Sequence, residues 1–207
     1  VAKDEAFCFY YKDNFRLLKS MGAELVTFSP MRDEHLPENL KGLILGGGYP
    51  ELNARELEAN VSMREDIHRA LNDGMPCLAE CGGFMYLHDE MEAMDGNSYH
   101  MAGVISGRAY RTQRLNRFGY VTLTQKKEVL GMNDMGGIPA HEFHYFDSEN
   151  CGDDFDAKKP ASHRKWNCIH GTDTMMAGFP HLYFYGNPKV PEAFLRKCSQ
   201  YGRQDAR

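Results

Sequence analysis

The sequence lacks the features that would assign it to a membrane, to secretion or to nucleic acid. It has no apolar run close to the roughly 20 residues that span a bilayer. Its opening residues, "VAKDEAFCFYY", do not have the pattern of a secretion signal. Basic residues form no stripe, and the formal net charge is -5. We therefore expect a cytoplasmic protein that binds neither membranes nor nucleic acid.

The sequence also lacks a disulfide framework and a zinc motif. Its six cysteines are irregularly spaced, which favours reduced thiols in a chain without a secretion signal. Three residues separate Cys77 from Cys81, but no second close pair of cysteines completes a metal site. We therefore expect free thiols and no metal.

The composition is that of a folded enzyme-sized domain. The 207 residues are 42% hydrophobic and 26% charged, so a sizeable core is expected and disorder is not. We take residues 1–207 as one domain.

The first half of the sequence alternates apolar runs with helical patterns. Strands are expected at 6–11, 23–30, 40–51 and 75–80, and helices at 13–22, 51–76 (in two pieces) and from 81 to about 91. Such alternation predicts an α/β fold with a mostly parallel central sheet and helices on both faces. Two glycine-rich points, at 46–48 and 81–83, follow strands, where α/β sheets collect their reactive groups.

The second half of the sequence has a different pattern. Additional, largely antiparallel strands are expected within 103–127, 137–150 and 175–188, a loop or hairpin tip within 151–168, and a closing helix at 191–200. We expect these strands to pack on the same core as the first half.

The stretch "CLAECGGFMYL" places Cys81 between a strand and a helix. A residue at such a turn adopts strained dihedrals and projects from the sheet edge. Gly82 and Gly83 let the backbone approach closely, and a helix start favours the thiolate, the reactive form of cysteine. The N–H of Gly82 is placed to bind an oxyanion. The alternative is a structural cysteine at a strand end.

A nucleophilic thiol needs a base, and nine histidines compete for that role. His181, in the apolar run "FPHLYFYGNP", has the context of a polar group at a sheet edge. His141 and His144 are three residues apart and should face opposite sides of a strand, whereas Glu142 and His144 should share a face. Solvent-facing roles are expected for five others: His35, His68, His88, His100 and His163.

The ordered set "GLILGGGYPE", "CLAECGGFMYL", "HEFHY" and "HLYFYGNP" resembles the glutamine amidotransferase domain of cobyrinate a,c-diamide synthases. The resemblance covers nearly the whole chain and implies a flavodoxin-like glutaminase fold of the triad type. Cys81 would attack the side-chain amide of glutamine to form a glutamyl thioester and release ammonia. His181 matches the catalytic histidine.

The same resemblance assigns supporting residues. Gly47 and Gly48 match a loop that lines the oxyanion pocket beside Gly82, and Glu51 follows in that loop. Glu142 and His144 match a family motif of unassigned role. Triad-type glutaminases carry a Glu two residues after the histidine, a position that Tyr183 fills here. The resemblance therefore implies a Cys–His dyad, with Tyr183 as a phenol in the third position.

The complete synthases implied by the resemblance also contain an ATP-dependent amidating domain, which carries a G-x4-G-K-[ST] loop. No such loop occurs here, because "GGGYPE" lacks the lysine and the hydroxyl residue. We expect this chain to be a fragment or subunit that needs no cofactor itself. ATP and Mg²⁺ would bind the synthase domain, expected upstream, which would also bind the corrin acceptor.

Two alternatives stay open on the sequence alone. The chain could be the glutaminase of another amide synthase, acting on a nickel tetrapyrrole or a cell-wall precursor. It could also be a cysteine-elbow protein that is not a glutaminase.

Overall fold

The computed structural model describes residues 1–115 and 117–202. Its central sheet has four strands in the order β1–β2–β12–β11, with bounds β1 Leu43–Leu45, β2 Cys77–Glu80, β12 Met175–Gly178 and β11 His170–Gly171. The first three strands are parallel and β11 is antiparallel. This is the mostly parallel central sheet that the sequence predicts.

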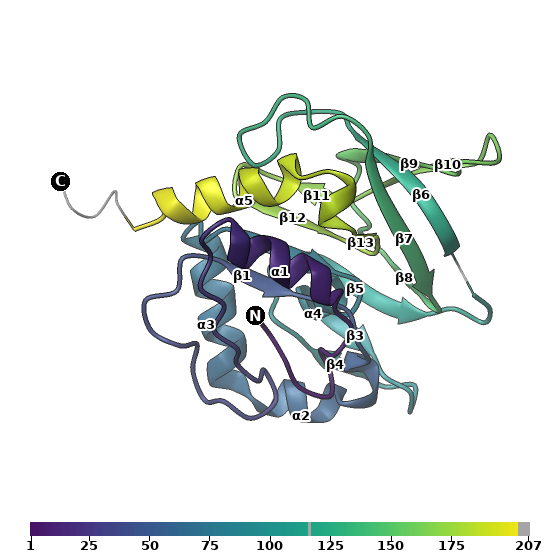
Figure 1. Ribbon diagram of the computed structural model, residues 1–207. Coiled ribbons are helices and arrows are strands. Elements are labelled where there is room, and N and C mark those ends of the chain that lie inside the picture. Colours follow the sequence, from purple (N-terminus) through teal and green to yellow (C-terminus); the bar gives the residue numbers. More distant parts are fainter. Residues whose placement is uncertain (116, 203–207) are drawn as a thin grey trace.

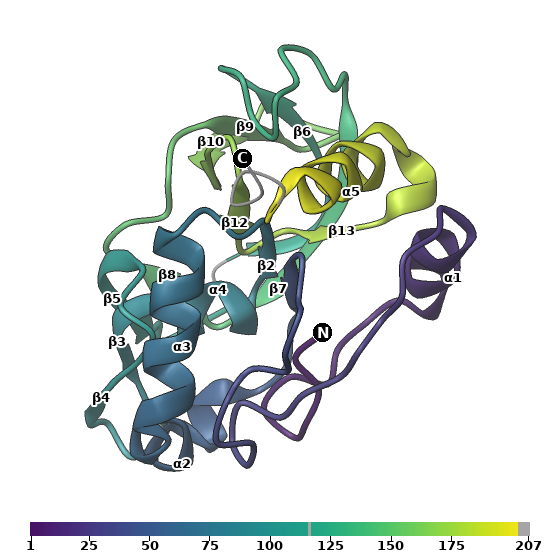
Figure 2. The same ribbon diagram turned by 90° about the vertical axis from the view of Figure 1, so that its left-hand side faces the viewer.

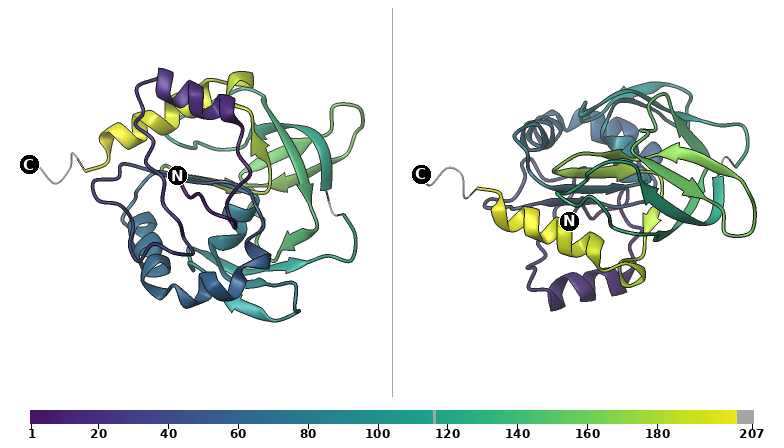
Figure 3. Two further views of the ribbon diagram at one scale, coloured as in Figure 1. Left: turned by 60° about the horizontal axis from the view of Figure 1, so that its bottom comes forward. Right: turned by 90° about the horizontal axis from the view of Figure 1, so that it is seen from above.

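Helices cover both faces of this sheet (Figures 1 and 3). One face carries α1 and α5, and the other α2, α3 and the short α4; their bounds are α1 Lys12–Ser20, α5 Lys189–Gln200, α2 Ala54–Ala59, α3 Val61–Asn72 and α4 Gly82–Tyr86. Alternate strand residues explain the two layers, because neighbouring side chains on a strand point to opposite faces. Ile44 and Leu78 pack towards α1 and α5, whereas Leu45 and Ala79 pack towards α3 and α4.

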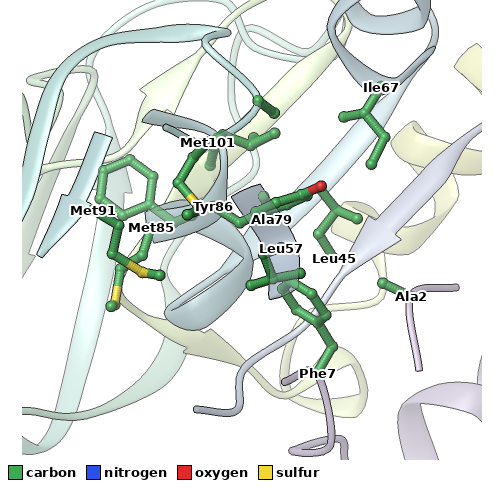
Figure 4. Close-up of a cluster of buried hydrophobic side chains, with 14 of the residues drawn as sticks. Ala2, Phe7, Leu45, Leu57, Ile67, Ala79, Met85, Tyr86, Met91 and Met101 are labelled. Carbon is green, nitrogen blue, oxygen red and sulfur yellow. The ribbon is translucent and has the colours of Figure 1, made fainter. Parts of the chain in front are cut away.

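The core under α3 and α4 is dense and apolar. Figure 4 shows Tyr86 of α4 among Leu45, Leu57 and Ala79, with all four side chains inaccessible or nearly so. Burial raises the pKa of the Tyr86 phenol, which therefore stays neutral. This layer holds α4, and with it the residue that precedes α4, against the sheet.

Two further sheets come mostly from the second half of the chain. One has the order β10–β9–β6–β7–β13, with bounds β10 Lys165–Cys168, β9 Phe155–Lys158, β6 Arg117–Gln125, β7 Ile138–His144 and β13 His181–Leu182. The other has the order β4–β3–β5–β8, with bounds β4 Ser98–His100, β3 His88–Glu92, β5 Ile105–Arg111 and β8 Phe146–Ser148. The first is wholly antiparallel, and its β9–β10 hairpin lies in the expected loop-or-hairpin segment.

Two short 3-10 turns occur among the described residues, η1 at Pro50–Leu52 and η2 at Phe184–Gly186. The expected helix at 51–76 does occur in pieces, as η1, α2 and α3. Figure 2 shows α3 along one side of the molecule and α1 and α5 on the other. No helix within the described residues is both long and apolar enough to cross a bilayer.

The strands expected at 6–11 and 23–30 are wrong. Neither segment forms a regular ladder, and each makes only a single bridge, Phe9 with Gly47 and Phe28 with Ala2. The Asp4 carboxylate accepts the N–H groups of Ala6 and Phe7, which turns the chain away from a regular ladder.

The long helix expected from residue 81 is also wrong, because α4 ends at Tyr86 and β3 begins at His88. The His88 ring accounts for the early end. Its Nδ1 lies 2.9 Å from the carbonyl oxygen of Phe84, and its Nε2 lies 2.6 Å from Ser148 Oγ. His88 is fully buried rather than solvent-facing, and burial lowers its pKa to about 4.

Gly83 tests how tightly α4 docks on β1. A Cβ at Gly83 would overlap the backbone carbonyl of Leu45. Since backbone atoms yield little, Gly83→Ala should lower the free energy of unfolding by about 3 kcal/mol. Gly74→Ala is the control: its site is open and only its positive φ opposes a side chain, at a cost of about 1 kcal/mol. Urea unfolding measures both, and equal losses would contradict the tight docking of α4.

Candidate active site

Three parallel strands of the central sheet end at one edge, where the expected site residues gather. After β1 the chain runs into Gly46–Gly48, and after β2 into Cys81. Three residues after β12 the chain reaches His181. The carboxyl ends of parallel strands are where α/β sheets build their sites.

Cys81 occupies a strained backbone conformation at the tip of this edge. Its φ is 47° and its ψ is -104°, a region that residues with a side chain rarely adopt. Such strain costs about 1–3 kcal/mol and persists only where the surroundings impose it. Here Cys81 N–H donates to the carbonyl of Gly178 and Gly83 N–H to that of Gly46, both at 2.9 Å. The thiol is thereby held at the start of α4, and the residue is 8% exposed.

Two backbone amides converge beside the thiol. A Cβ on Gly82 would lie 3.1 Å from the nitrogen of Gly48, so these two glycines are in contact. In residues 1–115 and 117–202, neither of the two N–H groups donates to a protein acceptor. Free N–H groups next to a nucleophile are the donors that stabilise an oxyanion.

Gly47 lies directly against the imidazole of His181. A Cβ at Gly47 would overlap Cε1 of the His181 ring, so this glycine makes room for the imidazole. The ring is also contacted edge-on by Phe9, with a centroid separation of 4.8 Å. His181 is only 6% exposed and is therefore fixed from two sides.

The imidazole of His181 lies between two groups that bear on its charge, the thiol of Cys81 and the carboxylate of Glu80. Nδ1 is 3.5 Å from Glu80 Oε2, a separation typical of an ion pair and too long for a good hydrogen bond. The other oxygen of Glu80 accepts the N–H of Leu182 at 3.2 Å, which orients the carboxylate.

The pKa of His181 follows from this arrangement. Burial alone would lower it, but the interactions with Cys81 and Glu80 outweigh burial and raise the pKa to about 10. His181 is therefore an imidazolium at neutral pH. It can donate a proton to a group bound beside the thiol.

Tyr183 does not take the third position, contrary to our expectation. That expectation assumed a regular strand through Tyr183, but β13 ends at Leu182 and η2 begins at Phe184. The Tyr183 side chain is 42% exposed and packs edge-on against Tyr11, at 5.9 Å between centroids. The acid beside His181 is Glu80.

A cleft of about 250 Å³ opens over the thiol. Its lining consists of Phe9, Gly48, Tyr49, Glu51, Cys81, Met85, His141, Phe143, His144, Tyr145, Phe146 and His181. Glu51 forms no ion pair with any described residue, and burial raises the pKa of its carboxyl above the usual value. His141 also lines the cleft. Burial lowers its pKa, and the nearby His181 lowers it further.

Glu142 and His144 share the buried face of β7. Glu142 Oε2 lies 3.0 Å from His144 Nε2, and its Oε1 accepts the Trp166 indole N–H at 3.2 Å. His144 Nδ1 lies 2.7 Å from the carbonyl of Phe146, so that nitrogen carries a hydrogen, and the ring stacks on Phe179. This saturated network supports the cleft wall and has no contact with the thiol among those described.

The comparisons with known proteins agree with this geometry. The sequence-family model of the CobB/CobQ-like glutamine amidotransferase domain matches residues 1–188 of this chain. The chain belongs to this family.

Within the described residues no group of three or more His, Cys, Asp or Glu side chains could hold a metal, and the six cysteines are free thiols.

Curated relatives of this amidotransferase domain are named cobyrinate a,c-diamide synthase. The protein of Caldanaerobacter subterraneus subsp. tengcongensis is 40% identical over 205 residues, which are 98% of this chain and 45% of that protein. The protein of Clostridium acetobutylicum is 42% identical over 194 residues, 90% of this chain and 42% of that protein. The chain thus spans less than half the length of these relatives.

Solved structures show the same fold at low identity. A crystal structure of a glutamine amidotransferase has a TM-score of 0.62 at 16% identity and covers 91% of this chain and 93% of its own. PurLQS from Thermotoga maritima has a TM-score of 0.59 at 15% identity, with 92% of each chain covered. The amidotransferase domain therefore has the expected flavodoxin-like glutaminase architecture.

Glu80 is not among the site residues expected from the sequence. A local signal exists, because Glu80 is the residue before Cys81 in "AECGG", at the end of an apolar strand where a carboxylate is unusual. The resemblance to triad-type glutaminases instead places the acid after the histidine.

Replacing Glu80 by Gln tests its role as the residue that orients His181. Gln retains an oxygen for Leu182 N–H but loses the charge, so the fold should persist. The pKa of His181, followed by NMR titration of its ring, should fall from about 10. The kcat of glutamine hydrolysis should fall about a hundredfold. Tyr183→Phe is the matched control and should change neither; equal effects of the two substitutions would refute the assignment of Glu80.

Proposed function

We propose that this chain hydrolyses the side-chain amide of glutamine through a thioester on Cys81 and supplies the ammonia to an ATP-dependent synthase. The observation that carries the proposal is the strained Cys81, flanked by two free N–H groups and by the imidazolium of His181. That combination provides a nucleophile, an oxyanion site and a proton donor at one point.

The proposed reaction has two halves. The Cys81 thiolate attacks the amide carbon, and the oxyanion is bound by the N–H groups of Gly48 and Gly82. The imidazolium of His181 then protonates the leaving nitrogen, so ammonia departs and a γ-glutamyl thioester remains. Water attacks the thioester while His181 takes its proton, which releases glutamate and restores the thiolate. The sum is glutamine and water to glutamate and ammonia.

The acceptor is proposed from the names of the relatives. Curated proteins 35–42% identical to this chain are called cobyrinate a,c-diamide synthase. Ammonia made here would accordingly amidate the a and c carboxylates of cobyrinate. That step would take place in an ATP-dependent portion that binds the corrin, ATP and Mg²⁺. We assign both cofactors to that portion because this sequence has no phosphate-binding loop of the G-x4-G-K-[ST] kind.

Cys81→Ala tests the central step. It should abolish glutamine hydrolysis and glutamine-dependent amidation, because no other group can form the thioester. Amidation supplied with free ammonia should persist in the complete synthase. His181→Ala should reduce glutamine hydrolysis about a thousandfold or more. Cys198→Ala is the control thiol and should leave hydrolysis unchanged. Glutamine turnover by a Cys81→Ala protein would disprove the mechanism.

Glu51 is proposed to bind the α-ammonium group of glutamine. It lines the cleft, forms no ion pair with a described residue, and its buried carboxyl has a raised pKa. A cation would therefore find, within the cleft that holds the thiol, a buried acid that Arg111 influences electrostatically but with which no described residue forms an ion pair. The resulting charge-assisted hydrogen bond would orient the substrate.

Glu51→Gln should raise the KM for glutamine about tenfold, because a hydrogen bond to a charged group contributes about 1.5 kcal/mol. The analogue 4-carbamoylbutanoate has the same amide and carboxylate but no amino group. The variant and the unsubstituted chain should therefore turn over this analogue at nearly the same rate. Steady-state kinetics with both substrates give the answer, and a similar loss for the two substrates would exclude an ammonium site at Glu51.

A further inference from the structure

Exposed aromatic side chains are concentrated around the active-site cleft. In residues 1–115 and 117–202, eight aromatic residues are among the exposed large hydrophobic ones: Phe9, Tyr49, Phe118, Tyr120, Phe143, Tyr145, Tyr183 and Tyr185. The other exposed large hydrophobic residues are aliphatic: Val26, Leu52, Val61 and Met94. Single exposed apolar residues are ordinary, but a contiguous group marks an interaction site.

One arm of this group extends from the catalytic histidine. Phe9 contacts His181 and lies 5.6 Å from the Tyr11 ring, centroid to centroid. Tyr11 in turn contacts Tyr183, whose ring is 6.1 Å from that of Tyr185. The rings form an unbroken series from the buried imidazole to the surface.

The other arm lies on the solvent side of β6 and β7. Phe118 is directly opposite Phe143 in the ladder, and Tyr120 is opposite His141. Ring contacts continue from Phe143 to Tyr145 at 6.0 Å. The exposed face of an antiparallel sheet is ordinarily polar, so a row of aromatic rings there is unusual.

The two arms meet at the cleft. β13 pairs with β7 so that His181 lies opposite His141, which joins the first arm to the second. Burial, then the nearby Glu80 and Tyr120, raise the pKa of the Tyr11 phenol, so Tyr11 and Tyr120 lie near each other. Phe9, Tyr49, Phe143 and Tyr145 all line the cleft. We call the eight exposed residues and Tyr11 the aromatic collar.

We propose that the aromatic collar is the surface on which the ATP-dependent synthase portion docks, so that the cleft opens into that portion. This rests on the proposed function, which assigns such a portion to the complete enzyme. The curated relatives continue for more than half of their length outside the matched region, so a partner of sufficient size exists in them. Interfaces have cores rich in Tyr and Phe and poor in charge, as the collar is.

The position of the collar gives docking a chemical consequence. Ammonia forms at Cys81 and must leave through the cleft that the collar surrounds. A partner seated on the rings would receive ammonia directly and keep it from water, which would protonate it. Binding on any other face would leave the cleft open to solvent.

The test uses the full-length Caldanaerobacter synthase with this chain in place of its matching region, and the 207-residue chain alone. The collar variant is Phe118→Thr with Tyr120→Thr. Neither residue lines the cleft, and Thr retains the preference for a strand. The control variant is Val26→Thr with Val61→Thr, which removes exposed apolar groups that are not part of the collar. Rates of glutamine hydrolysis, glutamine-dependent amidation and ammonia-dependent amidation are measured, with hydrogen exchange of β6 and β7.

In the full-length protein, the collar variant should lose glutamine-dependent amidation at least tenfold, because central aromatic residues dominate interface affinity. Ammonia-dependent amidation and glutamine hydrolysis by the chain alone should stay within twofold. Backbone amides of β6 and β7 should exchange more slowly in the full-length protein than in the isolated chain. The control variant should match the unsubstituted protein throughout.

Three outcomes would overturn the proposal: equal amidation by the collar and control variants, equal exchange of β6 and β7 in the isolated and full-length proteins, or a dimer of the isolated chain that the collar variant dissociates. The last would make a second copy the occupant. Failure of the proposed function is a separate result. If Cys81→Ala leaves glutamine hydrolysis intact while β6 and β7 are protected, the docking surface stands and the thioester mechanism falls.

Discussion

The strained backbone of Cys81 depends on two hydrogen bonds that tie it to neighbouring strands. Cys81 N–H donates to Gly178 at the end of β12, and Gly83 N–H donates to Gly46 at the end of β1. The elbow is therefore held across the whole parallel part of the sheet. The packing of Tyr86 and its neighbours below α4 supplies the free energy that offsets the strain. The position of Cys81 therefore depends on both the hydrogen bonds to the sheet and the packing of the core.

The parts of the fold that were predictable are those in which local pattern and tertiary context agree. The apolar run before Cys81 and the glycines after it specify a strand, a turn and a helix, and the structure has all three. The prediction fails where side chains take over backbone partners. Asp4 binds the amides of an extended segment, and the His88 ring binds the helix carbonyl of Phe84. Neither contact leaves a periodic signal in the sequence.

The site residues also divide into those that the sequence predicts and those that it does not. Cys81 and His181 could be found because their residue types and flanking patterns are local. The position of Glu80 before Cys81 is also a local signal, but its partner is not, because that depends on which strand end β13 passes, and the pairing of β13 with β7 fixes it. The aromatic collar is likewise a product of register. Phe118 and Phe143 are 25 positions apart in the sequence and become neighbours only in the β6–β7 ladder.

The placement of Glu80 directly before Cys81 puts the thiol and the carboxylate beside His181 on a single rigid piece of backbone. A shift of the elbow carries thiol and carboxylate together, so the distance between them is preserved. The imidazole belongs to a separate element, the two-residue strand β13, which pairs with β7 and is followed by a 3-10 turn. Alignment of the three groups thus reduces to one mechanical coordinate, the displacement of β13 relative to the elbow. A displacement of Phe9, whose ring touches His181, therefore changes that coordinate directly.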